Sequence, residues 1–107
     1  MNVDISFRKV FVVQSGYNYS ALVGYTKQMV FITTGNETME DLPEVIAQSL
    51  RDFNPKTDGI VAVGKVNTTL LVGIELAKRF PGEAVNLGLF QNKFVEKPNY
   101  EWRVVQL

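Results

Sequence analysis

Three short polar loops, each following an apolar run, hold the residues best suited to bind a ligand. They run over residues 15–19, 34–36 and 64–69, and each contains a glycine and an asparagine. Glycine lets backbone N–H groups approach an anion closely, and N–H groups at the start of a helix attract phosphate. The loops therefore predict a site for a nucleotide or another phosphorylated small molecule. Its predicted residues are Ser15, Gly16, Tyr17, Asn18, Thr34, Gly35, Asn36, Gly64, Lys65, Asn67 and Thr68.

The same residues also have an ordinary structural explanation. Glycine, asparagine and threonine are common turn residues, and Asn67 is placed to cap the helix that follows it. Tyr17 and Tyr19 favour the ligand, since aromatic rings can stack on a nucleotide base. The sequence leaves both explanations open for each loop.

Each loop follows a run whose composition predicts a buried β-strand. These runs cover residues 10–13, 29–33 and 60–63, and they are rich in β-branched residues, as in strands covered on both faces. Residues 84–90 predict a fourth strand. Residues 100–105 alternate apolar with charged side chains, which is typical of an edge strand, and the short link before them favours antiparallel pairing.

Two helices and one short helical piece separate these strands. Residues 42–53 place apolar side chains at helical spacing, Asp41 and Glu44 resemble a capping box, and Asn54 with Pro55 ends the helix. Residues 68–80 predict the second helix and residues 21–23 the short piece. The chain has 107 residues, enough for one domain.

We therefore expect a single α/β domain over residues 1–107, built in three layers. Its sheet would be mostly parallel, with about five strands and an antiparallel C-terminal edge strand, in a Rossmann-like or flavodoxin-like arrangement. If the first three strands are parallel, the three loops meet on one rim of the sheet. Proteins of this architecture usually bind ligands at that rim.

The composition excludes several classes of function. The chain has no histidine and no cysteine, which removes the usual general base, the thiol nucleophile and the thiolate metal site. We expect no catalytic residues, no metal and no cofactor. The 11 basic and 11 acidic residues cancel, so the chain lacks the basic surface of a general nucleic-acid binder. Without a membrane-spanning run or a signal peptide, the expected location is cytoplasmic.

Three further patterns look functional but have simpler explanations. Residues 59–66 spell G-x-x-x-x-G-K-V, yet the middle of this near match to a phosphate-binding loop is the predicted strand. Tyr100 and Trp102 are expected to pack on the sheet. The last pattern is acidic, and without histidine it suits the dipole of the first long helix better than a metal. Its members are Glu37, Glu40, Asp41 and Glu44.

The second long helix, residues 68–80, predicts contact with a partner. Its charged residues Glu75, Lys78 and Arg79 occupy a narrow arc, whereas its apolar residues spread over roughly 200°. A single sheet face covers only part of that width, so either a second helix of the same chain or a second subunit must cover the rest. Glycine inside the helix allows close approach of that partner. We expect a homodimer through Val72, Gly73, Leu76 and Phe80.

The chain also resembles small uncharacterised proteins encoded by tailed bacteriophages. The resemblance implies a viral accessory protein that acts in the host cytoplasm. Some small viral α/β proteins bind or cleave cyclic nucleotides of host defence, and those that cleave commonly use histidine, which is absent here. The analogy thus implies binding without catalysis. The stretches that carry the resemblance are residues 10–14, 19–20, 29–35, 52–55, 58–64 and 85–87.

Two functions remain open from the sequence. The first is a module that binds a nucleotide or another phosphorylated small molecule on the rim of the sheet. The alternative is a homodimeric interaction module that acts through the apolar face of residues 68–80 and takes no ligand.

Overall fold

The structure is a computed structural model that describes residues 5–91 and 99–107. Strands and helices follow one another in the predicted order. The strands are β1 (Val10–Gln14), β2 (Met29–Thr33), β3 (Gly59–Val61), β4 (Ala84–Gln91) and β5 (Asn99–Gln106). The helices are the 3-10 helix η1 (Ser20–Gly24) and the α-helices α1 (Leu42–Ser49) and α2 (Val66–Arg79).

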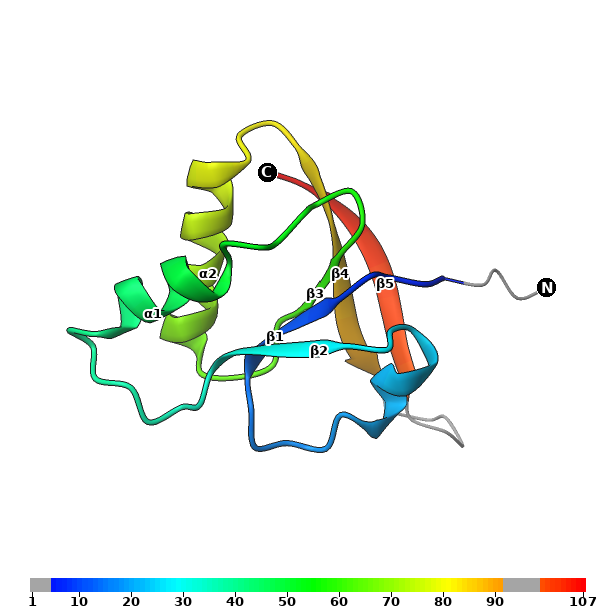
Figure 1. The fold of residues 1–107 in the computed structure, drawn as a ribbon, viewed down its shortest axis with the longest axis horizontal. Helices are drawn as coiled ribbons and strands as arrows, with labels where there is room; N and C mark the ends of the chain where they lie inside the picture. The colour runs from blue at the N-terminus through cyan, green and yellow to red at the C-terminus, as the bar shows by residue number, and fades with distance from the viewer. Residues whose placement is uncertain (1–4, 92–98) are drawn as a thin grey trace.

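The strands form one five-stranded sheet in the order β2-β1-β3-β4-β5 (Figure 1). β1 is parallel to both of its neighbours, β2 and β3, and β3 is parallel to β4. β5 is antiparallel to β4 along its whole length. The predicted fold, a mostly parallel sheet with an antiparallel C-terminal edge strand, is confirmed. The strand order is that of flavodoxin-like sheets, apart from the direction of β5.

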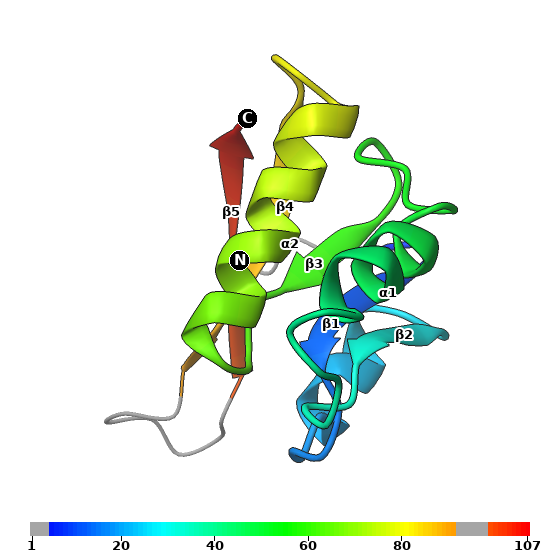
Figure 2. The ribbon, with the colours of Figure 1, turned by 90° about the vertical axis from the view of Figure 1, so that its left-hand side faces the viewer.

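The two faces of β1 support two separate cores. Phe11 and Val13 pack in the core that also holds side chains of α1 and α2, whereas Val10 and Val12 pack with Leu22 of η1. Both long helices therefore cover one face of the sheet, and the short η1 lies on the other (Figure 1 and Figure 2). The domain therefore has three layers, with two α-helices on one face of the sheet and one short 3-10 helix on the other.

α1 begins at Leu42, as predicted, but its cap and its end differ from the prediction. Asp41 makes no side-chain cap; instead its N–H donates to Thr38 Oγ1 at 3.2 Å. The helix ends at Ser49, and Leu50 and Phe53 reach the core from the turn that follows. The predicted apolar stripe is thus largely buried, although only part of it is helical.

α2 begins before the predicted position, at Val66, so Asn67 lies inside the helix and is not its N-cap. Its last turn is fixed by Arg79, whose Nε donates to Glu75 one turn earlier at 2.6 Å. The Nη2 of the same arginine donates to the carbonyl of Ala47 in α1, also at 2.6 Å. These bonds hold the two helices side by side on the sheet.

The indole of Trp102 crosses the η1 face of the sheet. A Cβ atom on Gly88 would lie 2.7 Å from the ring, and one on Gly59 would lie 2.8 Å from it, so only glycine fits at these two strand positions. Phe7 packs on the indole with 4.5 Å between ring centroids, and Tyr100 is buried nearby. Trp102 and Tyr100 therefore pack on the sheet, as predicted.

Asp58 is a fully buried carboxylate at the start of β3. Arg8, just before β1, donates to both of its oxygens, from Nε at 3.0 Å and from Nη2 at 2.7 Å. The N–H of Asn54 donates to it at 2.8 Å. The same guanidinium also donates to the exposed carboxylate of Asp52 at 3.1 Å. One buried group thus joins β1, β3 and the turn after α1.

Replacing Asp58 with alanine should lower the free energy of unfolding by about 3 kcal/mol, because Arg8 and the Asn54 N–H lose their buried acceptor. Replacing Asp52 with alanine should cost far less, since that carboxylate contacts the same arginine in solvent. Urea unfolding followed by the fluorescence of the single tryptophan measures both losses. Equal losses would contradict the role of Asp58.

Candidate functional site

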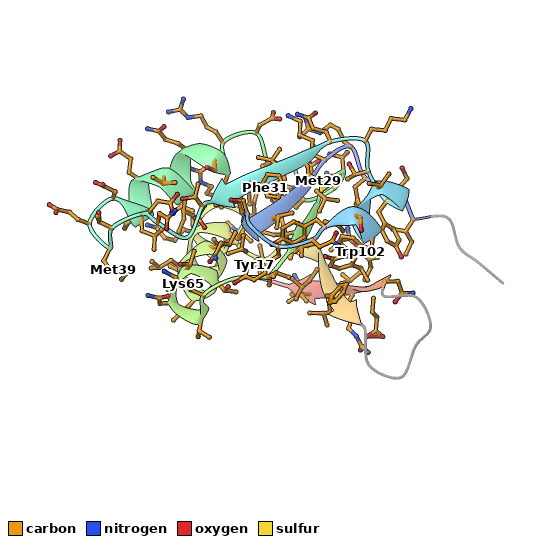
Figure 3. All side chains as sticks on the ribbon, turned by 90° about the horizontal axis from the view of Figure 1, so that it is seen from below. Tyr17, Met29, Phe31, Met39, Lys65 and Trp102 are labelled. Atoms are coloured by element: carbon orange, nitrogen blue, oxygen red, sulfur yellow. The ribbon has the colours of Figure 1, made fainter. Side chains whose placement is uncertain are left out.

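The three predicted loops lie along one rim of the sheet. Because β1, β2 and β3 are parallel, the loops after them leave at the same edge, at the lower side of Figure 1. Figure 3 looks onto this rim and labels Tyr17 from the first loop, Lys65 from the third, and Met39 from the segment between the second loop and α1. The sequence therefore predicted correctly which loops would share an edge.

Gln14, the last residue of β1, holds two of these loops together. Its Oε1 accepts a hydrogen bond from the Lys65 N–H at 3.1 Å. A Cβ on Gly35 would lie 2.7 Å from Gln14 Nε2, and one on Gly64 would lie 2.8 Å from Gln14 Cβ. Both glycines also have positive φ angles, +89° and +152°. Packing against Gln14 thus accounts for these glycines without any ligand.

The loop after β2 already holds an anion, the carboxylate of Glu37. The N–H groups of Thr34 and Gly35 donate to it at 2.9 and 3.0 Å, and the Thr34 hydroxyl donates at 3.0 Å. Burial raises the pKa of Glu37, but these hydrogen bonds outweigh burial and hold the pKa below its usual range. The N–H groups predicted to bind phosphate are therefore occupied by the chain itself.

The loop after β3 brings a positive charge to the rim. Lys65 Nζ donates to the carbonyl of Gly35 at 2.8 Å, which links this loop to the previous one. Asn67 and Thr68 lie in the first turn of α2, and Asn67 Oδ1 accepts from the Thr68 N–H at 3.0 Å. The other N–H groups of that turn have no acceptor within the helix. Lys65 and the helix start together attract negative charge.

A cavity of about 200 Å³ lies between these two loops. The prediction included four of its lining residues and missed the three that come from the start of the α1 segment. The missed carboxylate of Glu37 was assigned to the helix dipole, because the sequence does not show that its own loop folds around it. Pockets that enclose drug-sized ligands are usually about 300 Å³ or more, so this one fits a phosphate group better than a nucleotide. The lining residues are Gly35, Glu37, Met39, Leu42, Lys65, Asn67 and Thr68.

The loop after β1 runs toward η1 and does not line this cavity. Asn18 Oδ1 accepts from the Ser20 N–H at 2.9 Å, which forms a turn just before η1. Tyr17 is 55% exposed on the rim, whereas Tyr19 is buried and donates its hydroxyl to the Gln14 carbonyl. Stacking of Tyr19 on a base is therefore wrong, because its ring belongs to the η1 core.

Other predicted residues have local partners. The Ser15 N–H donates to the Thr33 carbonyl at 2.9 Å, which continues the pairing of β1 with β2. The Asn36 N–H donates to the Thr34 hydroxyl at 3.2 Å. Gly16 has a φ of +98° and open space around it. The structure thus brings together Gly35, Lys65, Asn67 and Thr68, and leaves the β1 loop outside this group.

A second cavity, also of about 200 Å³, is an apolar groove between α2 and the helix-side face of β4 and β5. None of the helices in residues 5–91 and 99–107 covers this part of the sheet. The predicted partner residues Val72, Gly73 and Leu76 lie along it. The lining residues are Val13, Ile60, Ala62, Thr69, Val72, Gly73, Leu76, Val85, Leu87, Val105 and Leu107.

The predicted contact residues on α2 need correction. Val72 and Leu76 are only 2% and 4% exposed, because they face the sheet and form the core. Phe80 packs on Phe53 with 5.8 Å between ring centroids. Of the four residues, Gly73 alone is exposed. The apolar surface that α2 presents to solvent is instead a neighbouring stripe, which consists of Val66, Leu70, Gly73, Ile74 and Ala77.

The chain matches no protein-family model, no curated protein and no solved structure. None of the helices described here is long and apolar enough to cross a membrane. Over residues 5–91 and 99–107, no three acidic, histidine or cysteine side chains are grouped so that they could hold a metal ion. The resemblance to phage proteins stays a prediction.

The Glu37 contact predicts a pH dependence of stability. Because its folded pKa lies below the usual 4.5, the carboxylate adds stability that is fully present above pH 4.5. That stability is lost as the pH falls through the folded pKa. We expect Glu37→Gln to lower the free energy of unfolding at neutral pH, and the difference from the parent chain to shrink in acid.

Urea unfolding over a series of pH values measures this difference. Glu83→Gln is the matched control, because Glu83 is exposed directly before β4 and lies away from the start of α1. The control should show little change at any pH. A loss in Glu37→Gln that stays constant from neutral to acidic pH would contradict the contact.

Proposed function

We propose that this protein is an interaction module that forms a homodimer through the outward face of α2. The observation that carries the proposal is the exposed apolar stripe of that helix. Val66 is 85% exposed, Leu70 is 63% exposed and Ile74 is 49% exposed. Together with Gly73 and Ala77 they follow the spacing of one helix face. Contiguous apolar surface of this kind marks protein contacts.

The stripe alternates large and small residues, which suits a second copy of itself. Leu70 and Ile74 are large, whereas Gly73 has no side chain and Ala77 has only a methyl group. In an antiparallel pair of α2 helices with a two-fold axis between Gly73 and Ile74, each Ile74 lies opposite Gly73 of the partner subunit. Each Leu70 then lies opposite Ala77 of the partner subunit. Two of the three large side chains of the stripe, Leu70 and Ile74, thus meet small ones, as close helix packing requires.

Replacing Ile74 with glutamate should halve the mass of the assembly, because a charge would be buried in the helix contact. Size-exclusion chromatography with light scattering at micromolar concentration measures this mass. Val23→Glu is the control: Val23 is equally apolar and 68% exposed, but it lies in η1 on the other side of the sheet. A parent chain that is already monomeric would refute the proposal.

Gly73→Ala separates the helix contact from an effect on folding. An added Cβ meets nothing within 4 Å, so alanine should stabilise the isolated subunit by up to about 1 kcal/mol through its helix propensity. In the dimer the same methyl group takes the space of Ile74 of the partner subunit, so association should weaken. A Gly73→Ala chain that is more stable and also associates more tightly would place the contact elsewhere.

The rim supports a second candidate function, the binding of a phosphorylated small molecule without catalysis. Lys65 and the first turn of α2 border a cavity that fits a phosphate group, and Tyr17 is exposed on the same rim. Glu37 disfavours such a ligand, because its carboxylate already accepts the hydrogen bonds of the neighbouring N–H groups and repels a second anion. The nucleotide predicted from the sequence would therefore lie mostly outside the cavity.

A thermal-shift screen with nucleotides and cyclic oligonucleotides tests this second candidate. Any stabilisation should vanish in Lys65→Ala and in Asn67→Ala, which line the cavity, and should grow in Glu37→Gln, which removes the competing charge. Lys56→Ala is the control, since Lys56 lies in the turn before β3 at the opposite rim. No shift with any compound, or an equal loss in Lys56→Ala, would exclude the rim as a phosphate site.

A further inference from the structure

β5 is an edge strand whose outer side has no strand beside it in the part of the chain described here. Figure 2 shows it at the left-hand edge of the sheet. Every second residue of such a strand turns its N–H and C=O groups away from the neighbouring strand. β5 has eight residues, contains no proline and pairs with β4 without a bulge. It therefore lacks three of the devices that usually keep an edge from pairing with another chain.

Two charged side chains of β5 lie on one face, two residues apart. Arg103 Nη2 is 3.0 Å from Glu101 Oε2, and the side chains are 64% and 39% exposed. On the other face, Val104 is 72% exposed and Tyr100 is buried. One face of the strand thus carries one negative and one positive side chain. The other face is apolar, and it is exposed at Val104.

We propose that β5 pairs in antiparallel fashion with β5 of a second copy, with the two-fold axis at Trp102. In this register Glu101 lies opposite Arg103 of the partner subunit, and Arg103 lies opposite Glu101 of the partner subunit. Opposite charges on facing residues stabilise a strand pair. On the other face, each exposed Val104 lies beside Tyr100 of the partner subunit. The two sheets become one continuous sheet of ten strands, since each subunit supplies five.

The charges select this register over its neighbours. Facing residues of paired strands point to the same side of the sheet, so the axis must pass through a residue. An axis at Arg103 places two arginines opposite each other, and an axis at Glu101 does the same with two glutamates. An axis at Val104 places Arg103 opposite Val105, and an axis at Tyr100 places Glu101 opposite Asn99. Trp102 is thus the centre at which both charges meet their opposites.

One existing contact must give way. The Tyr25 hydroxyl donates to the Tyr100 carbonyl at 3.4 Å, a long hydrogen bond that an N–H group of an added strand can replace. The proposed contact between two β5 strands does not depend on the proposed helix dimer, because α2 lies over the sheet and β5 lies at its edge. Two such symmetric contacts on one chain build an assembly larger than a dimer.

Two charge-reversed variants, Arg103→Glu and Glu101→Arg, provide the test. When two copies of one variant meet, both pairs of facing residues in the β5 contact carry like charges. The dissociation constant of that contact should therefore rise by at least about tenfold. Mixed in equal amounts, the two variants face each other with opposite charges at both pairs. We expect each variant alone to show a lower mass than the parent by light scattering, and the mixture to regain the parent mass.

The mixture separates contact between subunits from the ion pair within one strand, because neither variant regains its own Glu101–Arg103 pair on mixing. Lys56→Glu, a reversal at the far rim, should leave the mass unchanged, and circular dichroism checks that each variant is folded. Unchanged mass in both variants, or no recovery on mixing, would overturn the proposal. Ile74→Glu tests the helix contact separately, so either contact can fail without the other.

Discussion

The buried carboxylate of Asp58 is the group on which the arrangement of the sheet most depends. β1 and β3 are apolar on both faces, and apolar contact is non-directional, so it buries these strands without choosing their neighbours. A buried charge needs a specific partner, and Asp58 finds it in Arg8 and in the N–H of Asn54. This one requirement sets β3 beside β1 and draws in the turn after α1.

The need of a buried polar group for a specific partner also explains the residues at the opposite rim of the sheet. Gln14 ends β1 with a polar side chain that is only 8% exposed, and the Lys65 N–H supplies its hydrogen bond. Gly35 and Gly64 are glycines because the loops that enclose Gln14 come too close for a Cβ. The Glu37 carboxylate likewise accepts hydrogen bonds from the N–H groups of the loop after β2. Much of the rim is therefore polar in order to satisfy buried groups, which weakens the case for a ligand there.

Local patterns made the fold predictable from the sequence. The apolar runs predicted the strands. The alternation of apolar and charged side chains along β5, and the short link before it, predicted its antiparallel pairing. The site was less predictable, because its decisive contacts join distant residues: Lys65 meets Gln14 across 51 positions and the Gly35 carbonyl across 30. On α2, the width of the apolar arc correctly indicated surplus apolar surface. Which residues face outward depends on where the sheet lies, so Leu70 was missed.

Two surfaces of the described chain suit contact with a second copy and lie away from the rim loops: the apolar stripe of α2 and the outer edge of β5. They differ in kind. The apolar stripe of α2 is non-directional and supplies affinity without fixing a register. The edge of β5 presents hydrogen-bonding groups and two opposite charges, which fix a register but add little affinity when exposed to water. A chain that presents both kinds can separate the strength of its assembly from its geometry, and this division favours assembly over ligand binding as its function.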